Sequence, residues 1–436
     1  MEVPNPVQNP ENLPTPMVKK SGSIRSPRDR ADREEIILTW HNLDYIIKQK
    51  KGKEKTLLNG ISGEVKAGQM VAILGSSGAG KSTLLNVLSG RINEGIIKGQ
   101  ILVNGKPRSP KMWMKQCSVV EQDDTFYATV TVKESIQFSA NLRLPKQLQS
   151  SKNEHVDEVI EELGLINVKT AKIGSATRRG ISGGERRRCA IGVEFVVDPM
   201  LLMLDEPTSG LDSFIAFNII DSLKTLAREQ KRAVLMTIHQ PRETIVALFD
   251  KILLLSKGHC VFYGSMEEGL SYFQEIGFPC PENTNPCNHF IDLITIDLRT
   301  DAKQQSSEER INKLIDSWRQ QATKRTSYTY DPISQYDGPS SGTSSDKGLH
   351  RYEASWLYEF TILLKRNFKE TTQNPAIIAV TIVQSIFQLI LLTAVFNGLT
   401  KTQAGIQNRI GFFFFISLNL LFTNLMPTVN TFPLLR

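Results

Sequence analysis

The chain has 436 residues and a formal net charge of +7, so it is long enough for two or three domains that each bury a core. Its basic residues gather in separate runs that no helix or aromatic platform organises, which argues against nucleic-acid binding. The five cysteines are scattered, without a Cys-x-x-Cys pair, so we expect reduced thiols on the cytosolic side.

The first two predicted regions differ sharply in composition. Residues 1–34 are polar and rich in Pro, Asn and Ser, which predicts a disordered tail, and they contain no apolar core of a signal peptide. In residues 35–300, apolar runs such as "MVAILG", "LLMLD", "RAVLMTI" and "KILLLS" alternate with helical stretches. This pattern predicts an α/β domain with buried parallel strands.

The next region is predicted to connect that domain to a membrane. Residues 301–350 are rich in Ser, Gly, Asp and Gln, which is typical of a linker, although the part "SEERINKLIDSWRQQATK" can form a helix. Residues 351–375 contain "SWLYEFTILLKRNF", an apolar face with basic residues. We expect a connecting helix at the membrane interface there.

Residues 376–436 are predicted to form a partial transmembrane domain. Uncharged runs cover 376–396 and 410–432, each about the length that crosses a hydrocarbon core roughly 30 Å thick. Buried core helices are the alternative, but core helices of this length usually show a polar face. Three basic residues precede the first run, whereas the loop after it has only Lys401 and Arg409. The N-terminal side, with the α/β domain, should therefore be cytoplasmic.

A phosphate-binding loop is predicted at "GSSGAGKST", residues 75–83, which follows a strand and opens a helix. Its glycines let backbone amides and the helix N-terminus surround an anion. The lysine would reach the β- and γ-phosphates of ATP, and the serine after it would ligate Mg²⁺. A plain glycine-rich turn is the alternative. The predicted nucleotide-binding residues of this loop are Gly75, Ser76, Gly78, Gly80, Lys81, Ser82 and Thr83.

Two carboxylates follow the apolar strand "LLML" directly, Asp205 and Glu206. Burying such charges is costly unless a cation lies nearby. Magnesium held by ATP would be that cation, so we expect Asp205 to hold the metal through water and Glu206 to polarise the attacking water. A helix N-cap pair at the strand end is the alternative interpretation.

The stretch "ISGGE" predicts a second anion site. Ser182 and the amides of Gly183 and Gly184 stand at a predicted helix start. One nucleotide does not need two such sites, so we expect two copies of the chain to sandwich two ATP molecules, each lending its second site to the partner. His239 and Gln122 follow other strands and could contact the γ-phosphate and the metal, although either residue alone is a weak signal.

With these motifs in order, residues 35–300 resemble the ATP-binding cassette of ABC transporters. Glu185 where most of that family has Gln, and a cassette that precedes the membrane domain, resemble the G or White subfamily of half-transporters. Stretches such as "QDDTFYATVTVKESIQFSANLRLP", "IHQPR" and "GIQNR" are similar to one multidrug exporter in it. The resemblance implies an α/β P-loop NTPase fold followed by an α-helical transmembrane segment, with ATP and Mg²⁺ as cofactors.

The resemblance also assigns roles to individual residues. It implies catalytic roles for Glu206, His239 and Gln122, and metal contacts from Ser82, Gln122 and Asp205. Beyond the loop, the implied nucleotide-binding residues are Ser182, Gly183, Gly184, Glu185 and Asp212.

Two further sets of residues are less specific. Tyr45 is the predicted adenine-stacking aromatic, with Trp40 as the alternative, and core packing suits either. Phe415, Asn419 and Phe422 match positions that line the drug cavity of the multidrug exporter and recur at helical spacing. A lipid-facing or packing role is the alternative for these three.

The predicted function is that of a half-transporter, an ATPase that dimerises to export amphipathic or lipid-like compounds, including xenobiotics, across a membrane. We expect a multi-pass protein of the plasma membrane, with membrane lipid, a hydrophobic small molecule and a homo- or heterodimer partner, and no nucleic acid. Relatives carry further spans beyond the second, so we expect Arg436 to mark a fragment or a truncated product. The alternatives are a transport-incompetent ATP-binding subunit that modulates full-length partners, and a soluble cassette ATPase.

Overall fold

The computed structural model describes residues 35–48, 53–92, 94–123, 125–144, 151–175, 179–239, 241–282, 284–326, 355–373, 375–395, 406–407, 409–419 and 421. The chain divides into two compact units, Met1–Ile362 and Leu363–Arg436. Each unit is described by itself.

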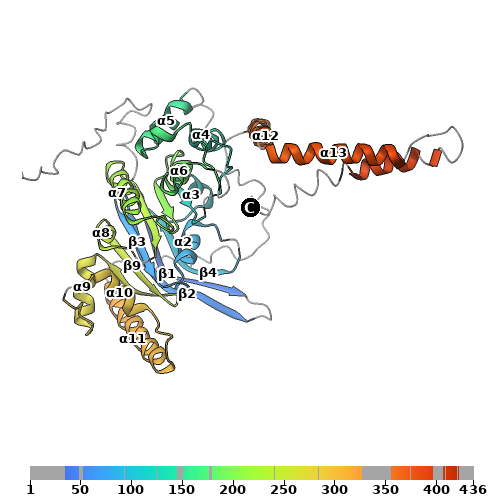
Figure 1. The fold of residues 1–436 in the computed structure, drawn as a ribbon. Helices are drawn as coiled ribbons and strands as arrows, with labels where there is room; N and C mark the ends of the chain where they lie inside the picture. The colour runs from blue at the N-terminus through green and yellow to red at the C-terminus, as the bar shows by residue number, and fades with distance from the viewer. Residues whose placement is uncertain are drawn as a thin grey trace, which may run out of the picture. The chain divides into compact units, whose positions relative to one another are not determined.

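The described part of the first unit is built around one ten-stranded sheet (Figure 1), with the strand order β5-β4-β1-β2-β10-β9-β3-β8-β7-β6. The strands are β1 (Ile37–Lys48), β2 (Glu54–Lys66), β3 (Met70–Gly75), β4 (Ile96–Val103), β5 (Lys106–Pro107), β6 (Cys117–Val120), β7 (Leu201–Leu204), β8 (Ala233–Ile238), β9 (Lys251–Ser256) and β10 (His259–Gly264).

One half of the sheet is parallel and runs through β9, β3, β8, β7 and β6. Every residue of β3, β7 and β8 is buried, as expected for strands covered on both faces. The register pairs Leu74 with Ile238 and Leu204 with Met236. The carboxyl ends of β3, β7 and β8 therefore meet at one edge, where ligands bind in sheets of this type.

The other half is an antiparallel extension in which β1 pairs with both β2 and β4. Trp40 of β1 is completely buried there. A Cβ atom on Gly63 of β2 would lie 2.5 Å from the Trp40 ring, so only glycine at that position leaves room for the indole.

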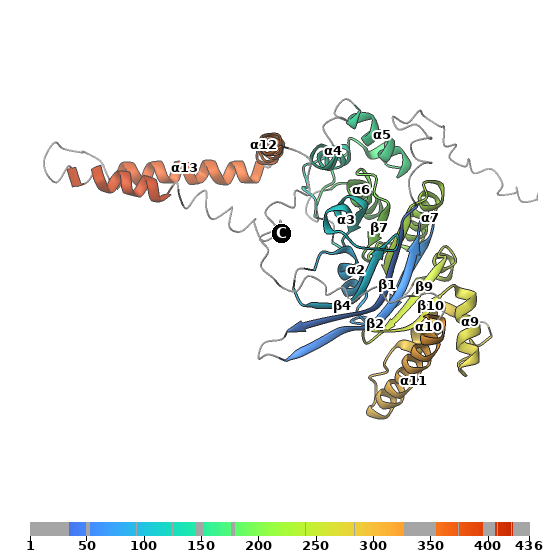
Figure 2. The same ribbon diagram turned by 180° about the vertical axis from the view of Figure 1, so that it is seen from behind.

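The helices of the first unit surround the sheet, and α4, α5 and α6 form a group at one end of it (Figures 1 and 2). The helices are α2 (Lys81–Ser89), α3 (Pro110–Gln116), α4 (Val132–Arg143), α5 (Lys152–Glu162), the 3-10 helix η2 (Ile166–Val168), α6 (Gly183–Phe195), α7 (Ser213–Glu229), α8 (Glu243–Val246), α9 (Met266–Glu275), α10 (Pro286–Ile294) and α11 (Asp301–Thr326).

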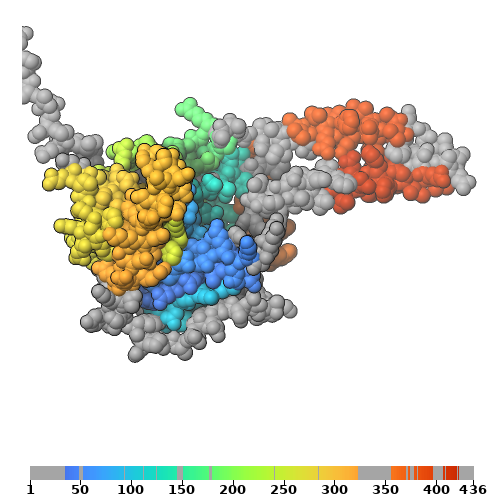
Figure 3. All heavy atoms as spheres, turned by 90° about the horizontal axis from the view of Figure 1, so that it is seen from below, coloured from blue at the N-terminus to red at the C-terminus, as the bar shows by residue number. Residues whose placement is uncertain are grey.

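Helix α11 differs from the predicted linker over 301–350. It packs on β10 and α10, and its apolar stripe Ile311, Leu314, Ile315 and Trp318 joins the core. Figure 3 shows the orange surface of this segment against the yellow part of the domain. The Trp318 ring lies edge-on to Phe262 with the centroids 5.3 Å apart. The domain therefore extends to residue 326, because a stripe at helical spacing buries apolar surface that a linker would expose. Residues 327–350 lie outside the described residues.

Two helices follow, α12 (Trp356–Gln373) and α13 (Pro375–Val395). Large apolar side chains of α12 are exposed, among them Trp356, Phe360 and Phe368. In α13, the 18-residue window Ile378–Val395 has a mean hydropathy of 2.2, with none of it buried. Among the described residues it is the one helix long and apolar enough to cross a membrane.

The second predicted span, 410–432, is described only in part. Arg409–Asn419 forms a shorter apolar helix, and residues 420 and 422–432 lie outside the described residues. The side chain of Gln388 on α13 donates a hydrogen bond to Asn419 Oδ1 at 2.6 Å. Polar contacts of this kind hold helices together where no water competes for them.

Candidate nucleotide-binding site

The predicted phosphate-binding loop connects the end of β3 to the start of α2. A Cβ atom on Gly75 would lie 2.5 Å from the carbonyl oxygen of Leu255, so the loop approaches β9 too closely for any other residue. Gly78 and Gly80 have φ of 76° and 103°, a left-handed conformation that favours glycine. The sequence pattern therefore reflects the backbone path that the loop takes.

The N-terminus of α2 is open to an anion. Gly80 is its N-cap, no side chain caps it, and its first turn contains no acidic residue. The first N–H groups of a helix have no partner within the helix. The loop therefore presents uncapped amides and the positive end of the helix dipole, which fit a phosphate group.

Lys81 places its ammonium inside this loop. Its Nζ donates hydrogen bonds to the carbonyl oxygens of Gly75 at 2.9 Å and Ser76 at 3.1 Å. Burial lowers the pKa of Lys81, and the nearby charges of Glu206 and Asp205 oppose that shift. The structure thus holds a desolvated cation where the terminal phosphates of a nucleotide would lie.

Ser82 and Asp205 come together from different elements. The Ser82 hydroxyl donates to Asp205 Oδ1 at 3.0 Å, and the hydroxyl of Thr237 on β8 donates to the same oxygen at 2.5 Å. A hydroxyl beside a carboxylate is an oxygen donor set of the kind that Mg²⁺ takes. The residues present therefore fit magnesium next to a nucleotide phosphate.

Glu206 is held in a sparsely populated backbone conformation. Its φ is 43°, and its N–H donates to the Thr237 hydroxyl at 2.8 Å. The Gln122 side chain, in the loop after β6, donates to Glu206 Oε2 at 3.1 Å. The structure therefore brings these two predicted catalytic residues into contact, at the edge where β3, β7 and β8 end.

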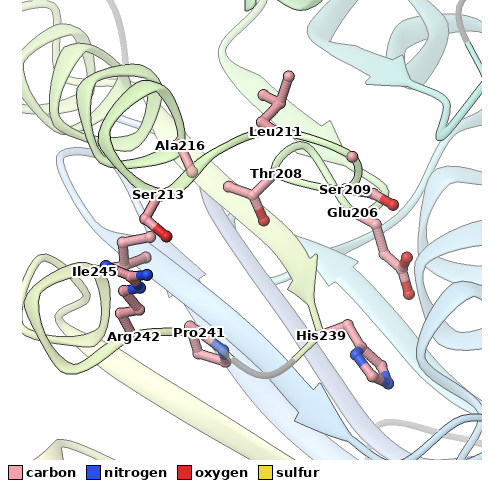
Figure 4. A pocket seen from close by; sticks show the side chains of 11 residues that line it. Glu206, Thr208, Ser209, Leu211, Ser213, Ala216, His239, Pro241, Arg242 and Ile245 are labelled. Carbon is pink, nitrogen blue, oxygen red and sulfur yellow. The ribbon is translucent and has the colours of Figure 1, made fainter.

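His239, directly after β8, lies exposed beside a pocket of about 320 Å³. Figure 4 shows His239 and Glu206 at the same end of this pocket, and Arg242 toward the other end. The predicted catalytic residues His239 and Glu206 thus line the same pocket.

The stretch "ISGGE", residues 181–185, here called the signature segment, forms side-chain hydrogen bonds within itself. Ser182 caps α6, and its N–H and hydroxyl both donate to Glu185 Oε2 at 2.8 Å, while the Glu185 N–H donates back at 3.3 Å. Gly184 is buried, and a Cβ atom there would lie 2.3 Å from Ile215, so glycine allows α6 to approach α7. Gly183 stands exposed at the first position of the helix.

Asp212 caps α7, accepting from the backbone N–H groups of Phe214 at 3.0 Å and Ile215 at 3.1 Å. Its side chain is thus engaged within its own helix terminus. Within this chain, Asp212 and the signature segment contact their own helix termini. Their predicted contacts to a nucleotide therefore stay predictions.

The interpretation of the sequence missed two residues at this site, Thr237 and Arg187. The guanidinium of Arg187 donates to the carbonyl oxygens of Glu121 at 2.6 Å and Asp205 at 2.8 Å. It joins α6 to the loop that contains Gln122 and to the end of β7. In the sequence, Arg187 belongs to a basic run and Thr237 to an apolar strand. A polar residue in an otherwise apolar, buried strand was the available signal.

Tyr45 lies in the core, and its hydroxyl donates to the Glu94 carbonyl at 3.0 Å. Burial raises the pKa of this tyrosine. Trp40 is also buried. Neither ring offers a free face to adenine, so the structure favours the packing interpretation of both.

The predicted cavity residues are only partly described. Phe415 and Asn419 lie on the helix Arg409–Asn419, and Asn419 accepts the hydrogen bond from Gln388. Phe422 lies outside the described residues. The drug-cavity role stays a prediction for all three.

A phosphate-binding loop, a strand-end carboxylate pair and a glutamine beside it define a P-loop nucleotide-binding domain. The family model described as ABC transporter matches residues 58–209, and two models described as ABC-2 type transporter match 239–328 and 358–436. The chain belongs to the ABC transporter family, and its relatives place it in the G subfamily of half-transporters. The predicted family and fold class are confirmed.

Curated relatives match over most of this chain. It is 36% identical over 448 residues to the broad substrate specificity ATP-binding cassette transporter ABCG2 of Bos taurus, covering 95% of this chain and 67% of that protein. It is 34% identical to ABC transporter G family member 22 of Dictyostelium discoideum, covering 91% and 64%. For protein white of Drosophila melanogaster the identity is 33%, covering 92% and 61%. The chain thus spans about two thirds of the length of these relatives.

Among solved structures, cbiO1 from Clostridium perfringens, part of the ABC transporter complex cbiONQ, matches at 27% identity with a TM-score of 0.46. The match covers 56% of this chain and 94% of that one.

Proposed function

We propose that this chain is an ATP-hydrolysing half-transporter that pairs with a second half-transporter to export amphipathic or lipid-like compounds across a membrane, with its nucleotide-binding domain in the cytoplasm. The observation that carries the proposal is the cluster of Lys81, Ser82, Asp205, Glu206 and Gln122, joined by hydrogen bonds and close charges. The similarity to the broad substrate specificity ATP-binding cassette transporter ABCG2 supports a transport function.

The chain's own groups divide the work on ATP. The open N-terminus of α2 and the Lys81 ammonium bind the phosphates. Glu206 accepts a proton from the attacking water, and Gln122, 3.1 Å from it, orients that water and the carboxylate. His239 donates a hydrogen bond to the γ-phosphate from the rim of the shared pocket. These steps are general-base and electrostatic catalysis.

Ser82, Asp205 and Gln122 would hold magnesium. When bound, Mg²⁺ neutralises charge that develops on the phosphate oxygens. The position of the Ser82 hydroxyl against Asp205 supports this assignment.

Pairing of two chains would complete each site. The uncapped α2 terminus supplies one half, and Ser182 with the amides at the start of α6 supplies the other half to the nucleotide of the partner. Two ATP molecules then hold the cassettes together, and hydrolysis releases them. We place the protein in the plasma membrane as a multi-pass protein, with a hydrophobic small molecule as cargo.

The test is ATP-dependent uptake of a fluorescent amphipath by vesicles that contain the purified chain, compared with the Glu206→Gln variant. The variant should bind ATP normally but hydrolyse it about 100-fold more slowly, because a positioned general base contributes about that factor or more. Uptake should fall with hydrolysis. Equal rates in both proteins would refute the assignment of Glu206, and hydrolysis without uptake would favour the alternative, an ATP-binding subunit that modulates transporting partners.

A further inference from the structure

One buried hydroxyl, that of Thr237, connects the two carboxylate residues of the site. Thr237 is the only polar residue of β8, the strand that lies between β3 and β7, and it is completely buried. A hydroxyl in such a strand is retained only where it has hydrogen-bond partners. Here the partners belong to Asp205 and Glu206, two predicted residues of the nucleotide site.

The hydroxyl acts as donor and acceptor at once. It donates to Asp205 Oδ1 at 2.5 Å and accepts from the Glu206 N–H at 2.8 Å. The same Asp205 oxygen accepts from Ser82. Thr237 thus fixes the orientation of the predicted metal-holding carboxylate and the backbone of the predicted general base with a single atom.

The backbone of Glu206 is the part that needs support. A glutamate at φ 43° is in a left-handed conformation that L-residues with a Cβ adopt at a cost. The N–H that this conformation presents is the one that Thr237 binds. The Glu206 side chain then contacts Gln122 at 3.1 Å, so the hydroxyl indirectly determines where the base points.

We propose that Thr237 is a positioning residue for ATP hydrolysis, an inference that rests on the proposed function. It holds Asp205 and Glu206 in register with each other without touching the nucleotide. Loss of the hydroxyl should therefore slow the chemical step and weaken the response to magnesium, while ATP still binds to the loop and Lys81.

The test compares three variants of the full chain in lipid vesicles: Thr237→Val, which keeps the shape, Thr237→Ser, which keeps the hydroxyl, and Ser256→Ala. Ser256 is the matched control, because its buried hydroxyl on β9 donates to the Ile294 carbonyl at 3.0 Å, away from the carboxylates. Thr237→Val should lower kcat about 10- to 100-fold, in the range of a mispositioned catalytic group, with KM for ATP changed less than about 3-fold. Thr237→Ser should recover most of the rate, and Ser256→Ala should keep it.

A second readout does not depend on hydrolysis. The affinity for a non-hydrolysable ATP analogue is measured with Mg²⁺ and with a chelator, and Thr237→Val should lose most of the gain that Mg²⁺ gives the wild type. An unchanged kcat and an unchanged Mg²⁺ gain in Thr237→Val would overturn the inference. So would equal losses in all three variants. Absence of ATPase activity in the wild type would count against the proposed function, and the Mg²⁺ gain would still decide the role of Thr237.

Discussion

Two helix N-termini of the same domain, those of α2 and α6, are capped in opposite ways, although the sequence predicts an anion site at each. The N-cap of α2 is Gly80, with no side-chain cap, whereas the N-cap of α6 is Ser182, which forms a complete capping box with Glu185. The amides of α2 are thus left for a ligand. At α6, the N–H groups of Ser182 and Glu185 donate to each other's side chains.

The first turn of α2 favours a bound anion by its charge, and the first turn of α6 does not. Lys81 opens α2, and no acidic residue stands in its first turn, whereas Glu185 stands in the first turn of α6. Positive charge beside a helix N-terminus attracts phosphate, and a carboxylate there competes with it. Under the proposed function, this difference predicts that the α2 terminus binds nucleotide in a single chain, and that the α6 terminus contributes only when a partner brings a phosphate to it.

The largest effect on the predicted nucleotide site at α2 is expected from Lys81→Met, which removes the cation but keeps the length of the side chain. ATP affinity should fall by at least about 30-fold, because a buried charge-assisted contact to phosphate is lost. Fluorescent nucleotide titration of the purified chain measures this. Lys98→Met, at an exposed lysine of β4, is the matched control and should bind as the wild type does. Equal affinity in both variants would contradict the assignment of the α2 site.

A smaller effect with a sharper pattern is expected from Ser182→Ala. The variant should bind ATP as well as the wild type, because the α2 site is intact. Its nucleotide-promoted pairing and ATPase rate should fall about 10-fold, because losing one donor to a phosphate costs that much or more. Cross-linking of paired chains and steady-state hydrolysis measure the two quantities.

Ser265→Ala is the matched control for that experiment. Ser265 caps α9 with the same box, toward Glu268. Both serine variants should lose about 1 kcal/mol of unfolding free energy, the usual worth of an N-cap, yet only Ser182→Ala should lose pairing. If the two variants behaved alike, the signature serine would be only a helix cap.

Much of this comparison could be predicted from the sequence. The loop "GSSGAGKST" and the strand-end pair of Asp205 and Glu206 are local patterns, and parallel strands necessarily bring their carboxyl ends to one edge. The sequence interpretation therefore placed Ser82 near Asp205, and the structure has them 3.0 Å apart.

The parts that could not be predicted depend on contacts between distant segments. Thr237 lies 31 positions from Glu206 in the chain, and Arg187 lies 66 from Glu121, so no local spacing relates them. Helix α11 is a different case, because its stripe from Ile311 to Trp318 was visible. A linker that could form a helix in its first part was predicted there, but its polar composition did not indicate that this helix packs on the domain.

The smallest expected effect comes from Glu185→Gln, which keeps the shape of the capping box but removes its charge. Without that carboxylate, the partner's phosphate would approach α6 with less repulsion, so pairing should need about 2- to 5-fold less ATP. That factor corresponds to roughly 0.5 to 1 kcal/mol, the usual worth of one charge at a helix terminus.

Glu268→Gln, in the box of α9, is the matched control and should leave the ATP requirement unchanged, although both variants should lose a few tenths of a kcal/mol of unfolding free energy. Titrating ATP against cross-linked pairs in the Glu206→Gln background isolates pairing from hydrolysis. A higher ATP requirement for Glu185→Gln would mean that the carboxylate assists pairing, and the contrast between the open terminus of α2 and the occupied terminus of α6 would then have no bearing on how the two chains close.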